Sequence, residues 1–187
     1  LLSLFFLQLL TGCPAIDEFT KKKKPIRPEQ LVYKSFSGKN LQGTQNNGSL
    51  KIDVYPIPKI PYEPSFAPTP NRVLKPILLI HGGGWQLGST FQMIFAFWHT
   101  LLKNPEYRVF SIEHRSSACQ YTLDLIALGV PPENLCWAAP TQSEDLRDAI
   151  TYIKRNAEAF QIDPNALVLI GDSAGAHLAV LHALKES

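Results

Sequence analysis

The sequence predicts an α/β fold in which a mostly parallel sheet is flanked by helices. Short apolar runs that suit buried strands alternate with segments that have helical periodicity. Two of these runs lead directly into glycine-rich sequences, at 81–85 and at 171–175, which is typical of buried parallel strands that enter loops. With 187 residues, of which 45% are hydrophobic, the chain can bury a sizeable core and is not a disordered protein.

The charge and cysteine content exclude several classes of protein. Lys and Arg number 18 and Asp and Glu 16, so the net charge is only +2, and four of the basic residues form one run at 21–24. This charge is too small and too unevenly spread to indicate binding to nucleic acid. Three cysteines are too few for a disulfide-dense mini-protein, and no Cys/His cluster has zinc-ligand spacing, so no metal site is expected.

The first residues predict an export signal. Residues 1–10 are apolar and uncharged, which is half the length of a membrane-spanning helix but suits the centre of a signal peptide. Leu10-Thr11-Gly12-Cys13 is similar to a bacterial lipobox. We therefore expect residues 1–12 to be an N-terminally incomplete lipoprotein signal, Cys13 to be lipidated, and residues 13–30 to tether the domain to a membrane of the bacterial cell envelope. The alternative is a truncated transmembrane anchor, for which the lysine run favours a cytoplasmic side.

The first half of the domain is predicted to contain four strands. Strands are expected at 31–36 and at 50–54, with a turn at Asn46-Asn47-Gly48. Seven prolines between Pro56 and Pro76 predict an extended surface loop. Residues 77–80 are a continuous apolar run, as in a buried parallel strand, and a helix over 89–102 and a strand over 107–112 follow.

The second half is predicted to be helix, strand and helix. Thr141-x-x-Glu144 indicates a capping box, and apolar residues continue from it at helical spacing to Phe160. Asp163-Pro164 ends this helix, and a buried strand over 166–170 and a helix over 174–185 complete the chain. No internal repeat is visible, so residues 31–187 are assigned to one domain.

The sequence Gly171-Asp172-Ser173-Ala174-Gly175 lies where the last strand turns directly into the last helix. A nucleophile elbow holds its serine in a strained backbone conformation that projects the hydroxyl above the sheet. Strand and helix then approach so closely that the residues two before and two after the serine must be small, and here both are glycine. The helix also points its first N–H groups at the reacting centre. The alternative is a glycine-lined turn that binds a phosphate or nothing.

The sequence His81-Gly82-Gly83-Gly84-Trp85 also follows a buried strand. Its three glycines leave backbone amides open to a ligand. We expect the N–H groups of Gly83, Gly84 and Ala174 to form an oxyanion hole for an acyl-transfer intermediate. His81, Gly82, Gly171 and Gly175 support the two motifs. A phosphate loop is disfavoured, because the dinucleotide-binding pattern and the Walker lysine are both absent.

Together the two motifs resemble the α/β-hydrolase fold, specifically the hormone-sensitive-lipase-like carboxylesterases and their feruloyl- or acetyl-esterase relatives. The resemblance extends from Leu50 to the end of the chain. It includes Glu113-His114-Arg115, which is similar to the family's Asp-Tyr-Arg, and the helix from Ser143 that precedes the nucleophile strand. It implies a serine carboxylester hydrolase that cleaves a small-molecule ester through an acyl-enzyme, with Ser173 as nucleophile and without a cofactor or metal. The change from Tyr to His114 is not expected to affect catalysis.

The acid and the base of the triad are expected outside this chain. In this fold their order is Ser, then Asp or Glu, then His, and the residues after Ser173 contain no Asp. The chain is therefore interpreted as the N-terminal part of an α/β-hydrolase domain, truncated after the nucleophile helix and inactive by itself. The alternatives are an amidase, arylformamidase or peptidase on the same fold, or a non-catalytic binding protein.

Other polar residues are given structural roles. His99, His177 and His182 are interpreted as packing or surface residues, since a histidine four residues past Ser173 on a helix cannot easily turn back to its hydroxyl. Asp145 and Asp148 are expected to complement a helix dipole. Cys119 and Cys136 either pair in an oxidising compartment or remain reduced and buried.

Overall fold

The computed structural model describes residues 28–57, 73–93, 101–120, 125 and 130–186. Residues 1–12, Cys13, most of the tether, His99 and most of the proline-rich loop lie outside the described residues. The elements are, in chain order, β1 (Glu29–Lys39), β2 (Gln45–Val54), β3 (Lys75–Ile80), β4 (Tyr107–Ile112), the short 3₁₀ helix η1 (Pro132–Asn134), α5 (Thr141–Arg155), α6 (Ala157–Phe160), β5 (Val168–Gly171) and α7 (Ala174–Glu186).

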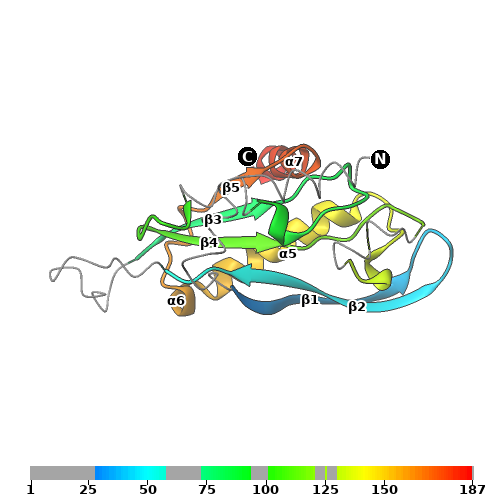
Figure 1. Ribbon diagram of the computed structural model, residues 1–187, viewed down its shortest axis with the longest axis horizontal. Coiled ribbons are helices and arrows are strands. Elements are labelled where there is room, and N and C mark those ends of the chain that lie inside the picture. The colour runs from blue at the N-terminus through cyan, green and yellow to red at the C-terminus, as the bar shows by residue number, and fades with distance from the viewer. Residues whose placement is uncertain (1–27, 58–72, 94–100, 121–124, 126–129, 187) are drawn as a thin grey trace, which may run out of the picture.

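The described strands form one sheet in the order β1-β2-β4-β3-β5 (Figure 1). β3 is parallel to both β4 and β5, as expected for strands joined through helical segments. β1 and β2 form an antiparallel hairpin, and β2 is also antiparallel to β4. The described sheet is therefore mixed, and its parallel part is the half that carries the two glycine-rich motifs.

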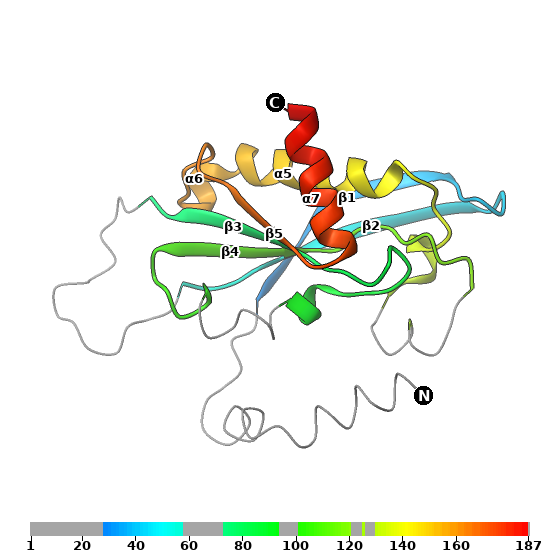
Figure 2. The same cartoon turned by 90° about the horizontal axis from the view of Figure 1, so that it is seen from above.

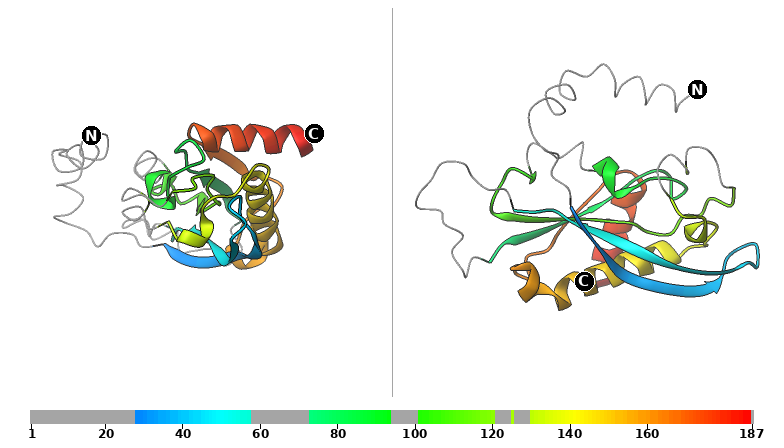
Figure 3. Two further views of the ribbon diagram at one scale, coloured as in Figure 1. Left: turned by 90° about the vertical axis from the view of Figure 1, so that its right-hand side faces the viewer. Right: turned by 60° about the horizontal axis from the view of Figure 1, so that its bottom comes forward.

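Two apolar cores cover the two faces of the sheet, because side chains alternate along each strand. In β3, Leu78 and Ile80 face the larger core, to which α5 and α7 contribute. Ile77 and Leu79 face the smaller core on the opposite side, with Met93 among its members. The two long helices thus pack on the same face of the sheet (Figure 3), and α7 runs across the strands (Figure 2).

The turn of the β1–β2 hairpin lies earlier than predicted. Asn46, Asn47 and Gly48 are paired residues within β2, opposite Gly38, Ser37 and Phe36. The chain reverses instead at residues 40–44, where the Asn40 side chain accepts hydrogen bonds from the backbone N–H groups of Gln42 and Thr44. Gly43 supplies the positive φ of 78° that this turn requires. The prediction missed a second asparagine–glycine turn that was already complete before Asn46.

The prediction of a capping box that begins at Thr141 is wrong. Thr141 is the first residue of α5 rather than its N-cap, which is Pro140 and has no side-chain capping bond. The first amides are satisfied locally, since the Ser143 and Glu144 N–H groups donate to the Pro140 carbonyl. The helix is also divided, because α5 ends at Arg155 and α6 follows Asn156.

Two other predictions needed small corrections. Pro76 belongs to β3 and not to the preceding loop, and it is buried there opposite Arg108. Of the helix expected over 89–102, the described residues include a helical start at 90–93. No helix within the described ranges is long and apolar enough to cross a membrane.

Candidate active site

The carboxyl ends of the three parallel strands β3, β4 and β5 meet at one edge of the sheet. Ile80 is in register with Ile112 on one side and with Gly171 on the other. Polar or glycine-rich sequences follow each of these ends, at 81–85, 113–117 and 172–175. In sheets of this kind ligands bind beyond the carboxyl ends of the strands. The structure therefore brings the two predicted motifs together and adds the segment after β4 to them.

Ser173 lies at a sharp turn between β5 and α7. Its φ is 48°, in the left-handed region that a residue with a side chain rarely adopts, and the residue is exposed. A Cβ on Gly171 would lie 2.3 Å from the Gly175 carbonyl carbon, and a Cβ on Gly175 would lie 2.1 Å from the Ile80 carbonyl oxygen. Only glycine fits at either position, which is the geometry expected of a nucleophile elbow.

The glycine loop after β3 packs directly against this elbow. The Asp172 N–H donates to the Ile80 carbonyl at 3.2 Å, and a Cβ on Gly82 would lie 2.8 Å from the Asp172 carbonyl oxygen. Gly83 and Gly84 have φ values of 111° and 64°, which L side chains rarely adopt. Gly83 and Gly84, which the sequence predicts to be oxyanion-hole residues, thus lie on a loop that contacts the residue immediately before Ser173.

Three further residues, Ser116, Ser117 and His177, contact the glycine loop and the residue that follows it. The Ser116 hydroxyl donates to the Gln86 carbonyl at 2.7 Å, and Ser117 donates to the Trp85 carbonyl through its N–H at 2.7 Å and its hydroxyl at 3.1 Å. The Trp85 ring packs edge-on against His177 of α7, with 5.3 Å between ring centroids. The His177 ring is thus engaged by Trp85, in agreement with its predicted packing role.

Beneath the glycine loop, His81 stacks on His114 of the segment after β4. The ring centroids are 4.1 Å apart and the planes differ by 16°. Burial lowers the pKa of His81 to about 3, with the second ring as a further cause, and burial also lowers the pKa of His114. The pair is therefore neutral at physiological pH. If both rings were protonated, two cations about 4 Å apart would repel each other at a large cost in free energy. That His114, at the family's tyrosine position, packs on the motif histidine could not be predicted from the sequence, because the two residues follow different strands.

The segment after β4 is anchored by a buried ion pair that the sequence analysis missed. Asp145 of α5 accepts from the Arg115 Nη2 at 2.6 Å, from its backbone N–H at 3.0 Å, and from the Lys34 Nζ at 2.7 Å. Asp145 and Asp148 were expected to complement the helix dipole, but the Asp145 side chain is fully buried and Asp148 also pairs with Lys34. The similarity of Glu113-His114-Arg115 to the family's Asp-Tyr-Arg was the available signal that Arg115 has a fixed partner.

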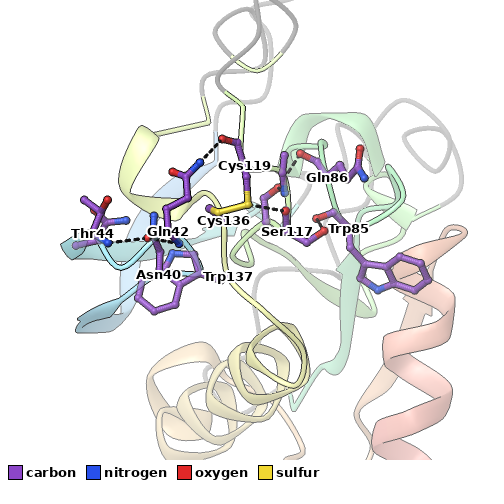
Figure 4. The surroundings of a disulfide bond; sticks show 12 residues. Asn40, Gln42, Thr44, Trp85, Gln86, Ser117, Cys119, Cys136 and Trp137 are labelled. Atoms are coloured by element: carbon purple, nitrogen blue, oxygen red, sulfur yellow. Dashed lines mark hydrogen bonds between the residues drawn. A yellow bond between two sulfur atoms is a disulfide. The ribbon is translucent and has the colours of Figure 1, made fainter.

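A disulfide joins Cys119 to Cys136 at the outer end of the same segment (Figure 4). The Gln42 amide donates to the Cys119 carbonyl, and the Leu41 N–H donates to the Cys136 carbonyl at 2.8 Å. The Arg115 guanidinium lies 4.8 Å from the Phe36 ring centroid and 4.7 Å from that of Trp137. The β1–β2 hairpin thus packs against the chain around the disulfide, called here the disulfide segment (residues 117–120 and 130–137). This contact also supports Arg115 and, through it, the residues that hold the glycine loop.

Comparison with known proteins agrees with this geometry. The family model BD-FAE matches residues 135–187, which include the elbow. A protein of Acanthamoeba polyphaga mimivirus named as an alpha/beta hydrolase is 24% identical over 177 residues, covering 91% of this chain and 46% of that protein. The ethyl acetate hydrolase of Pseudomonas putida is 30% identical over 107 residues, covering 57% of this chain and 28% of that protein.

Solved structures show the same fold. Thermogutta terrifontis esterase 2, phosphorylated by paraoxon, superposes with a TM-score of 0.56 at 20% identity and covers 86% of this chain and 48% of that one. The chain spans between 21% and 46% of the length of the curated relatives it matches. The fold, the elbow and these matches show that the chain has the α/β-hydrolase fold and is similar to carboxylesterase-like members of it.

Proposed function

We propose that the protein carrying this chain is a serine ester hydrolase in which Ser173 is the nucleophile. The observation that carries the proposal is the backbone of Ser173, whose φ of 48° is enforced by glycine contacts on both sides. Such strain persists only where the surrounding structure over-determines it, and it is concentrated at functional sites. The names of two relatives, an ethyl acetate hydrolase and an esterase, support an ester as the substrate class.

In the proposed reaction the Ser173 Oγ attacks the carbonyl carbon of the ester and its proton passes to a histidine base. The carbonyl oxygen becomes an oxyanion that the N–H groups of Gly83, Gly84 and Ala174 stabilise, each donor contributing about 2.7–4 kcal/mol. The intermediate collapses, the C–O bond to the alcohol breaks, and the base returns its proton to the leaving alcohol. Water then attacks the acyl-enzyme by the same route, which releases the acid and restores Ser173.

We propose that the acid and the base follow Ser187 in the full-length protein. The chain order of the triad in this fold supports this, since both residues come after the nucleophile. The histidines that follow Ser173 do not suit the role, because His177 packs on Trp85 and His182 lies five residues further along α7. An Asp or Glu and a His after successive downstream strands would support an enzyme, and their absence would favour a non-catalytic binding protein.

The test is Ser173→Ala in the full-length protein, with Ser143→Ala at the start of α5 as control. Ser173→Ala is expected to reduce hydrolysis of a short-chain p-nitrophenyl ester by several orders of magnitude and to prevent labelling by paraoxon, while leaving thermal stability unchanged. Ser143→Ala is expected to leave both signals intact. Turnover by the Ser173→Ala variant that is comparable to the parent would disprove the assignment. A preference for anilide over ester substrates would favour the amidase alternative.

We also propose that the protein is exported and anchored to a membrane through Cys13. The apolar run before Leu10-Thr11-Gly12-Cys13 supports this, and two or more acyl chains suffice for stable anchoring. Metabolic labelling with a clickable fatty acid is expected to mark the protein and to fail for Cys13→Ser. Labelling that survives this substitution would refute the anchor.

A further inference from the structure

A small cavity lies between the glycine loop and the disulfide segment. Its lining includes His81 and Gly88 from the loop, His114 and Ser116 from the segment after β4, and Asn134 from η1, and it holds about 20 Å³ of water-accessible space. A cavity of about 10–15 Å³ on this measure is enough for one water molecule. The site is therefore large enough for one small polar molecule such as water.

Two residues of this lining, His114 and Asn134, each carry a polar atom that is buried without a hydrogen-bond partner among the described residues, the His114 Nε2 and the Asn134 Oδ1. His114 is 6% exposed and Asn134 2% exposed, so neither side chain is hydrated from the surface in the usual way. A buried polar group that has no hydrogen-bond partner destabilises the fold. Two such groups on one water-sized cavity therefore indicate a common partner.

The chemistry of the two atoms defines that partner. The His114 Nδ1 lies 3.1 Å from the Arg115 carbonyl oxygen, which only accepts, so Nδ1 carries the proton and Nε2 is an acceptor. Burial lowers the pKa of His114, which keeps Nε2 unprotonated at neutral pH. The Asn134 Oδ1 is also an acceptor. The partner must therefore donate two hydrogen bonds from one centre, as a water molecule does.

We propose that one internal water molecule occupies this cavity and donates hydrogen bonds to the His114 Nε2 and the Asn134 Oδ1. With the tautomer set by the Arg115 carbonyl, the water fixes the orientation of the ring on which His81 stacks. It thereby joins the start of the glycine loop to η1, two residues before the disulfide cysteine Cys136. His114 and Asn134 are positioning residues in this arrangement, and the proposal does not depend on what the protein hydrolyses.

Selective ¹⁵N labelling of histidine in the full-length Ser173→Ala protein tests the tautomer and the bond to Nε2. His114 is expected to show a protonated Nδ1 and an Nε2 resonance shifted in the direction of an accepted hydrogen bond. Asn134→Leu, which matches the side-chain volume but holds no water, is expected to move this resonance. A protonated Nε2, or a resonance that does not respond to Asn134→Leu, would overturn the proposal.

A double-mutant cycle tests whether the two atoms share one partner. His114→Phe and Asn134→Leu each leave the opposite acceptor unpaired, whereas the double variant removes both, so its loss of melting temperature is expected to be clearly smaller than the sum of the single losses. Additive losses would refute the shared water. If any variant fails to fold, a high-resolution crystal structure of the parent decides, since a density peak within hydrogen-bond distance of both atoms is expected and a cavity without one contradicts the proposal.

Discussion

Asp145 is the residue whose burial most directly affects the support of the site. Its carboxylate is fully buried between the Arg115 guanidinium and the Lys34 ammonium, which come from segments far apart in the chain. A buried charge is tolerated only when it is paired and hydrogen-bonded. The loss of Asp145 would leave Arg115 buried and uncompensated beside the serines that hold the glycine loop.

Asp145→Asn is therefore expected to lower the free energy of unfolding by about 3–5 kcal/mol. The matched control is Asp148→Asn, one turn along the same helix. The Asp148 side chain also contacts Lys34 at 2.7 Å but is 39% exposed, and its loss is expected to cost no more than about 1 kcal/mol. Urea denaturation of both variants provides the comparison, and equal losses would show that burial of the pair is not decisive.

His81 and His114 make the stability depend on pH. An unfolded histidine has a pKa near 6.5, whereas the folded His81 has a pKa of about 3 and that of His114 is also lowered. Below about pH 6.5 the unfolded chain therefore binds protons that the folded chain does not. As the pH falls, each neutral buried ring then lowers the free energy of unfolding by up to about 1.4 kcal/mol per pH unit. Glu113, whose pKa burial raises, contributes in the opposite direction.

His114→Gln is expected to flatten the decline of stability between about pH 6.5 and pH 5, because one of the two groups no longer titrates. Denaturation curves at several pH values measure the slope. The control is Ile150→Val in the core, which is expected to lower stability without removing a titrating group. It is therefore expected to keep the parental slope of stability against pH. Parallel curves for His114→Gln and its parent would refute the assignment.

At the scale of elements, the contact between β3 and α7 determines the geometry of the elbow. The helix begins one residue after Ser173, and Gly175 rests against the carbonyl oxygens of Ile80 and His81, at 2.1 and 2.7 Å from an added Cβ. Strand and helix therefore meet through backbone contacts at the elbow, and the Ser173 side chain is exposed.

Gly175→Ala is expected to destabilise the protein by about 1–3 kcal/mol through overpacking and to reduce esterase activity. Helix propensity alone predicts the opposite sign, since Gly to Ala in a helix is normally stabilising by about 1 kcal/mol. Ala183→Gly, at an exposed position of α7, measures the propensity in this helix and is expected to cost about that amount. A Gly175→Ala protein that melts above its parent would show that the close contact relaxes freely.

At the scale of the molecule, β5 forms the last described strand of the sheet and pairs with β3 alone among the described strands. Val168 of β5 and Val180 and Leu184 of α7 are 47%, 58% and 69% exposed. A strand that has a neighbour on one edge only, beside exposed apolar side chains, promotes association between copies. This part of the surface is where further chain is expected to pack in the full-length protein.

Residues 14–187 produced alone are therefore expected to associate, to unfold without a cooperative transition and to react slowly with a fluorophosphonate probe. Val180→Lys with Leu184→Lys is expected to reduce the association, as measured by analytical ultracentrifugation, without speeding the reaction. Lys substitution at the exposed Leu41 of the hairpin turn is the control and is expected to change neither. A soluble monomer that melts cooperatively, or that is labelled rapidly, would contradict this prediction.

The sequence predicted the parts of the fold that depend on local pattern. The β3 and β4 strands follow from short apolar runs, and the glycine loop and the elbow follow from the glycine-rich sequences after β3 and β5. The errors arose where two local signals competed, as at Asn40 and Asn46, where both offer a turn and the first one closes the hairpin. The Asp145–Arg115 pair and the His81–His114 stack could not be read, because their partners are distant in the chain and meet only through the sheet.

The enclosure of Trp137 provides an optical signal for the state of the hairpin. Its indole is 7% exposed, meets Phe36 of β1 edge-on at 5.3 Å and donates to the Glu133 carbonyl at 2.9 Å. Trp85, by contrast, is partly exposed beside the elbow. Fluorescence of Trp137 should therefore be emitted at shorter wavelength than that of Trp85 and should shift to the red when the hairpin separates from the disulfide segment. A difference spectrum against Trp137→Phe makes the docking of β1 and β2 visible in real time, in a protein whose proposed nucleophile Ser173 lies outside the hairpin.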